Sequence, residues 1–77
     1  MAPVPVLAFG EKWFKRFFCD LVINEATKAG KDLKPANIRK VSHHIRRDYL
    51  NVPYKQLPLR EEVIANRIAK LIAHSWD

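Results

Sequence analysis

The chain has 77 residues, 48% of them hydrophobic, with 14 Lys and Arg against 8 Asp and Glu. A chain of this length can bury only one core, and its hydrophobic fraction is too high for an ordinary disordered tail. A single cysteine excludes an internal disulfide and the small secreted class that relies on one. No run of about 18 apolar residues is present to span a membrane. We expect an intracellular protein of the cytoplasm, nucleus or an organelle matrix, neither secreted nor transmembrane.

The formal net charge of +6 at pH 7 is large for so short a chain. Such an excess favours a polyanionic partner, which could be nucleic acid, an anionic membrane surface or an acidic protein. A basic subunit of a larger assembly, or charge that serves solubility alone, would give the same total. The placement of the cations therefore matters more than their number.

Residues 1–9 (MAPVPVLAF) are apolar and contain Pro3 and Pro5. Because each proline restricts the residue before it, the segment predicts an extended N-terminal arm ahead of a single three-helix domain over residues 10–77. No basic residue precedes the apolar run and Pro5 interrupts it, which is unlike a secretory signal.

The first helix is predicted over about residues 10–29, where large apolar side chains recur three and four positions apart. These side chains are Phe14, Phe17, Phe18, Leu21 and Val22. Trp13 widens this face to about half the circumference, while Cys19 and Ile23 interrupt the polar side. Gly30 stands where a helix often ends in a left-handed residue.

The second helix is predicted from residue 34 or 35 to residue 50, with Asp32 as its candidate cap and Pro35 in its first turn. Its apolar stripe is narrow and consists of Ile38, Val41, Ile45 and Tyr49. Two prolines then predict an extended connection over residues 51–58. The side chains expected to pack down from this connection are Val52, Tyr54 and Leu57.

The third helix is predicted from residue 58 or 59 to about residue 75, because proline suits a first helical position. Its expected buried side consists of Ile64, Ile68, Leu71, Ile72 and Trp76. Three alanines are expected to let a neighbouring helix approach closely, and they are Ala65, Ala69 and Ala73. The fold class is all-α, as a small three-helix bundle or a helix-turn-helix-like domain.

The polar side of the second helix is the most informative feature of the sequence. With Ile38 at 0° and 100° per residue, its polar residues between about 80° and 240° include no acid. We call them the basic face, and they are Arg39, Lys40, His43, His44, Arg46 and Arg47. Such a face suits phosphate contacts, and a helix of this size fits the major groove of DNA. The alternative is an ordinary solvated face, although such faces usually mix the two signs.

The order of the helices, with a basic second helix and a proline-rich connection before the third, is similar to DEK-type C-terminal DNA-binding domains. The stretches that resemble this family are the pair Asp32-Leu33, the pair Ile38-Arg39, and the helix that contains Ile64, Ile68 and Ile72. Many three-helix folds share this pattern, so we assign no family from it.

The sequence predicts no catalytic residue, cofactor, metal site or small-molecule substrate. His43 and His44 are adjacent, so they point about 100° apart and cannot chelate one metal together. Cys19 and the remaining histidine are too few to complete a site, and Cys19 is expected to be a partly buried small hydrophobe. His44 and Asp48 are four residues apart and are predicted to form an ion pair.

The aromatic cluster of the first helix admits three interpretations, and it consists of Trp13, Phe14, Phe17 and Phe18. Core packing is the first, because small domains need large buried side chains. A protein interface is the second, because this apolar face is wider than two short helices cover. The third is a helix lying on an anionic bilayer. The acidic residues of the same helix argue against this third interpretation.

Two functional hypotheses follow. The first is a non-enzymatic module that binds DNA or RNA through the basic face. The second is a small structural or accessory subunit of a multi-protein complex, docked through the N-terminal arm and the aromatic face of the first helix. The single sign of the basic face favours the first by a narrow margin.

Overall fold

The computed structural model describes residues 3–76, with side chains described over residues 12–53 and 55–76. It contains three α-helices, which are α1 (Pro3–Lys28), α2 (Pro35–Asp48) and α3 (Glu61–Ser75). Two single-turn 3-10 helices, η1 (Tyr54–Gln56) and η2 (Pro58–Arg60), connect α2 to α3. No strand occurs within residues 3–76, and the predicted all-α class is confirmed.

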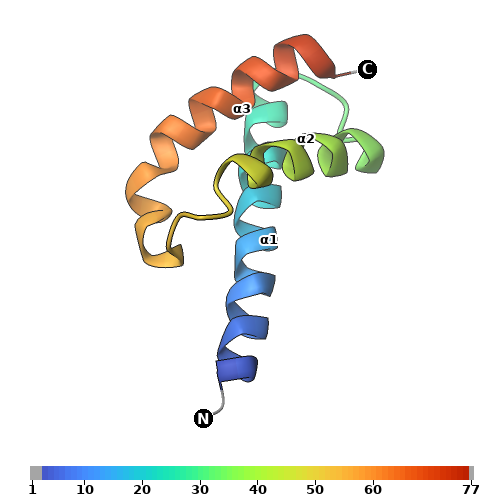
Figure 1. The fold of residues 1–77 in the computed structure, drawn as a ribbon. Helices are drawn as coiled ribbons and strands as arrows, with labels where there is room; N and C mark the ends of the chain where they lie inside the picture. Colours follow the sequence, from blue (N-terminus) through green and yellow to red (C-terminus); the bar gives the residue numbers. More distant parts are fainter. Residues whose placement is uncertain (1–2, 77) are drawn as a thin grey trace.

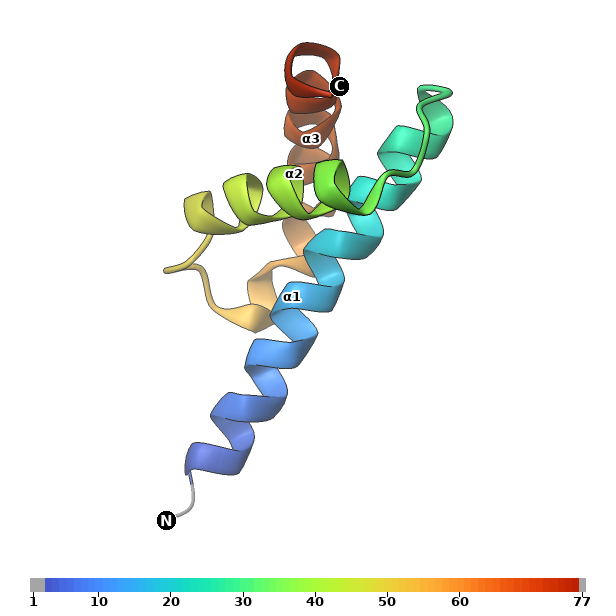
Figure 2. The same ribbon diagram turned by 90° about the vertical axis from the view of Figure 1, so that its right-hand side faces the viewer.

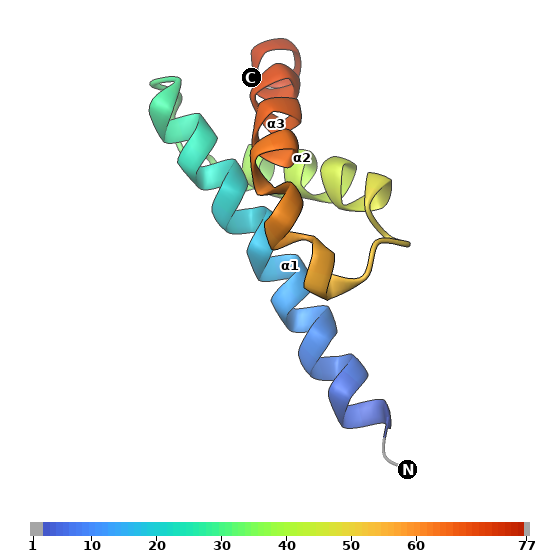
Figure 3. The ribbon, with the colours of Figure 1, turned by 90° about the vertical axis from the view of Figure 1, so that its left-hand side faces the viewer.

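Each of the three helices packs against the other two. The long helix α1 runs through the molecule, and its first turns extend beyond the other helices (Figure 1). Helix α2 crosses α1 on the side nearest the viewer in Figure 2, whereas α3 is nearest the viewer from the opposite side in Figure 3. The outer side of α2 is therefore left uncovered by the other two helices.

The core lies where the three helices meet. Its fully buried large side chains are Phe18, Val22, Val41, Ile45, Leu57, Ile64, Ile68 and Ile72. The ring of Phe18 is central, with centroids 4.9 Å from Phe14, 5.3 Å from Phe17 and 5.9 Å from Tyr49 of the α2–η1 connection. The core predicted from helical spacing is thus largely confirmed, and Leu57 anchors the connection to it.

Helix α1 begins at Pro3, whereas the sequence predicts an extended arm over residues 1–9. Pro3 and Pro5 are the first and third helical residues, where backbone N–H groups have no partner within a helix. Proline therefore removes no hydrogen bond there, and residues 3–9 belong to α1. The helix continues without a break across residue 10, and the first two residues lie outside the described range.

The end of α1 is a Schellman motif centred on Gly30, which has φ +71°. The N–H of Gly30 donates to the carbonyl of Thr27 at 3.1 Å, and the N–H of Lys31 donates to that of Ala26 at 2.9 Å. These two bonds satisfy carbonyls that a helix end leaves without partners. The predicted left-handed glycine is confirmed.

Helix α2 is capped differently from the prediction. Its N-cap is Lys34, whose ammonium group cannot accept a capping hydrogen bond, and Pro35 occupies the first helical position. Asp32 lies two residues too early to cap α2, and its backbone carbonyl instead accepts hydrogen bonds from the N–H of Lys34 at 2.9 Å and from Nε1 of Trp76 at 3.0 Å. The second bond holds the C-terminal end of α3 against the α1–α2 loop.

The alanines of α3 do not serve close helix packing as predicted. Ala69 and Ala73 are exposed and Ala65 is half-buried, because α3 buries a narrow stripe four residues apart. That stripe consists of Ile64, Ile68 and Ile72. Each alanine follows an isoleucine and is turned about 100° away from the core.

Replacing Gly30 tests the left-handed end of α1. No atom lies within 4 Å of a Cβ built at this position, so the cost of Gly30→Ala comes from the positive φ alone. We expect Gly30→Ala to lower the free energy of unfolding by about 1 kcal/mol, measured by urea denaturation. Gly30→Asn is the matched control and should cost less, since asparagine tolerates this region better. Equal losses for both variants would contradict the assignment.

Candidate nucleic-acid interface

The basic face is at the surface because the opposite side of α2 is buried. Val41 and Ile45 are 2% and 0% exposed, so α2 cannot rotate about its axis without exposing apolar surface. Arg46 is half-buried, and the exposed members of the basic face are Arg39, Lys40, His43, His44 and Arg47. All six predicted residues therefore reach solvent from one helix.

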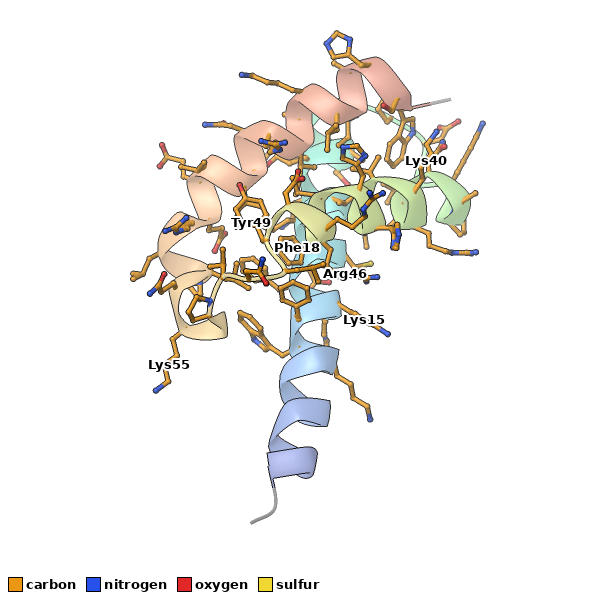
Figure 4. All side chains as sticks on the ribbon, viewed as in Figure 1. Lys15, Phe18, Lys40, Arg46, Tyr49 and Lys55 are labelled. Atoms are coloured by element: carbon orange, nitrogen blue, oxygen red, sulfur yellow. The ribbon has the colours of Figure 1, made fainter. Side chains whose placement is uncertain are left out.

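The basic face has two edges with different neighbours. On the α1 side, Arg39, His43 and Arg46 border a groove that also includes Lys15 of α1. Figure 4 shows the side chains of Lys15 and Arg46 on the same side of the molecule. On the α3 side, His44 and Lys40 border a smaller depression next to the end of α3. The second helix thus brings cations of α1 and α2 into one surface.

Two polar contacts hold side chains of the basic face in place. Nη2 of Arg46 donates to Nδ1 of His43 at 3.2 Å, one turn away on α2. Nζ of Lys40 donates to the backbone carbonyl of Ser75 at 2.8 Å. This ammonium lies at the negative end of the α3 dipole, where a cation is favoured, and it ties α2 to α3.

The acid at the margin of the basic face is paired outside it. Oδ2 of Asp48 lies 2.9 Å from Nη2 of Arg67 on α3. The predicted ion pair between His44 and Asp48 is therefore wrong, because packing of α3 brings a permanent cation to Asp48. This pairing directs the carboxylate toward α3 and keeps the basic face free of acids.

Other acids gather on the opposite side of α1. Glu25 of α1 and Glu61 and Glu62 of α3 line a shared depression, where Nζ of Lys28 lies 3.3 Å from Oε2 of Glu25. At 100° per residue, the α1 residues of this depression lie about opposite those that line the basic groove. Among the described side chains, the two glutamates of α3 that line this depression therefore lie away from the basic groove.

The predicted aromatic interface is mostly buried. Phe14 is 6% exposed and Phe18 is fully buried, so both are core residues without surface to offer a partner. Trp13 and Phe17 are half-buried, and their rings stack with centroids 5.0 Å apart and an interplanar angle of 19°. Only this stacked pair of the cluster has surface that a partner could contact.

Sequence reasoning missed the groove between α1 and α2. Its α1 wall includes Cys19 and Ile23, the two apolar residues that interrupt the polar side of the helix. That interruption was the available signal, but only the crossing of α2 over α1 turns it into a concave surface. Cys19 is half-buried there, as predicted.

Within the part of the chain that the structure describes, no three His, Cys, Asp or Glu side chains are grouped to hold a metal. No helix in that part is both long and apolar enough to cross a membrane. Comparisons with protein-family models, with curated proteins and with solved structures found no match.

A double-mutant cycle tests the pairing of Asp48. The side chain of Asp48 is 34% exposed and that of Arg67 is 53% exposed. Because the pair is partly solvated, we expect a coupling free energy of about 0.5 kcal/mol between Asp48→Ala and Arg67→Ala, measured by urea denaturation. The matched cycle of His44→Ala with Asp48→Ala should give coupling near zero. Stronger coupling to His44 than to Arg67 would contradict the observed pairing.

Proposed function

We propose that this chain is a non-enzymatic module that binds the phosphate backbone of nucleic acid through the basic face. The observation that carries the proposal is that five of the six residues are exposed and Arg46 is half-buried on one side of α2, with the neighbouring Asp48 held by Arg67. Most helices of small domains mix charges on their exposed side, whereas the basic face of this one carries a single sign.

The length of the basic face suits a nucleic-acid backbone. From Arg39 to Arg47, α2 rises about 12 Å at 1.5 Å per residue, and the major groove of B-DNA, roughly 12 Å wide, admits a helix of ordinary diameter. Cations at the two ends can then reach phosphates on both borders of the groove. Arg39, Arg46 and Arg47 would each neutralise phosphates, while His43 and His44 add hydrogen bonds.

Removing three arginines tests this proposal. Binding of the Arg39→Ala, Arg46→Ala, Arg47→Ala variant to labelled duplex DNA and to structured RNA is measured across a salt series. Each phosphate contact contributes about 0.9 to the slope of log K against log salt for B-DNA, so the slope should fall by about 2 to 3. Comparing the affinities for duplex DNA and for structured RNA identifies the preferred nucleic acid.

The matched control removes three cations that lie off α2. Lys28, Lys55 and Arg60 are exposed, and Lys55 projects from the opposite side of the molecule to Arg46 in Figure 4. Their triple alanine variant has the same net charge as the test variant and should retain most of the slope. Equal losses in both variants would show that net charge alone drives binding, and an unchanged slope in the test variant would refute the proposal.

A role as an accessory subunit is the second candidate. The first turns of α1 extend beyond the other helices (Figure 1), and their sequence is apolar. The half-buried stack of Trp13 and Phe17 lies further along the same helix. A chain that is folded yet binds neither DNA nor RNA at low salt would favour this function over the first.

A further inference from the structure

The groove between α1 and α2 has an apolar floor. Its volume is about 850 Å³, and the two helices contribute its walls. The apolar residues that line it are Cys19, Ile23, Pro35, Ala36 and Ile38. All of them are half-buried or exposed, so part of each apolar surface faces the groove rather than the core. Concave apolar surface of this kind is typical of binding sites.

The rim of the groove is cationic. Lys15 stands on the α1 side, Arg39 and Arg46 stand on the α2 side, and none of the lining residues among the described side chains is acidic. Figure 4 shows Lys15 and Arg46 projecting at the same side of α1. An occupant with an apolar centre and acidic flanks would therefore complement both the floor and the rim.

The dimensions of the groove fit a helix. Lys15, Cys19 and Ile23 are spaced four residues apart, so they form one line along α1 about 12 Å long. An amphipathic helix presents apolar residues at positions i, i+4 and i+7 over a similar length. Packed against α1 and α2 together, such a helix would become a fourth helix of the bundle.

We propose that this groove binds an acidic amphipathic helix of a partner protein. Two or three aliphatic side chains of the partner contact the floor at Cys19, Ile23 and Ile38, and its flanking carboxylates meet Lys15, Arg39 and Arg46. This inference goes beyond the proposed binding of nucleic acid and does not depend on it.

The floor favours a protein over nucleic acid as the occupant. Duplex nucleic acid offers phosphates to the rim but no apolar protrusion that fills the floor. Unpaired bases are usually held by stacking on aromatic rings, and the described side chains that line this groove include no aromatic ring. Aliphatic side chains of a partner helix bury the same surface without such a platform.

A designed peptide tests the proposal on the full chain. The probe is a fluorescein-labelled 18-residue peptide with leucines at i, i+4 and i+7 and glutamates between them, and binding is followed by fluorescence anisotropy. A scrambled peptide of the same composition, without a continuous apolar face, is the control. We expect the amphipathic probe to bind at least about tenfold more tightly than the scrambled one.

Matched variants place the peptide in the groove. Ala36→Trp fills the groove from the exposed start of α2, whereas Ala69→Trp places the same ring on the exposed side of α3. Lys15→Glu reverses a charge on the rim, and Lys55→Glu reverses one away from it. We expect the two groove variants to weaken binding about tenfold and the two controls to leave it unchanged.

Each outcome decides the proposal. Equal binding of the amphipathic and scrambled peptides would show attraction by charge alone and overturn it. Unchanged binding by Lys15→Glu, or by Ala36→Trp with a native circular dichroism spectrum, would place the peptide elsewhere and also overturn it. Nucleic-acid binding by the same variants is recorded separately, so that failure of the groove is distinguished from failure of the proposed function.

Discussion

Burial of Val41 and Ile45 between the other helices is the constraint on which the rest of the structure depends. These two side chains form a stripe so narrow that most of the circumference of α2 remains outside the core. Their burial fixes the rotation of α2 about its axis, and the rotation in turn determines which polar residues face solvent. The exposed cations and the groove beside α1 both follow from this one packing contact.

Contacts between α2 and α3 then determine which charged side chains of α2 are held within the fold. Arg67 of α3 pairs with Asp48, and the carbonyl of Ser75 accepts a hydrogen bond from Lys40. Both contacts lie on the α3 side of α2, so that side is engaged within the fold. The arginines toward α1 and toward solvent remain available to a partner, and the two proposed binding surfaces overlap at Arg39 and Arg46.

Helical spacing predicted the three helices and most of the core because large apolar side chains repeat every three or four residues. Single residues and short motifs were less informative about helix ends and side-chain partners. Prolines at the start of α1 are compatible with a first helical turn as well as with an extended arm. The partner of Asp48 depends on where α3 packs, and the groove depends on how α2 crosses α1. These features arise from tertiary geometry, for which the sequence gives at most a partial signal, such as Cys19 and Ile23 on the polar side of α1.

The most direct test of the central claim is a map of the binding surface on the folded chain. The backbone amide spectrum of the labelled protein is recorded by NMR during titration with duplex DNA and with structured RNA. If the basic face binds nucleic acid, amides of α2 between Arg39 and Arg47 shift most, while those around Glu61 and Glu62 stay in place. Shifts centred on the acidic side, or spread evenly over the chain, would contradict it.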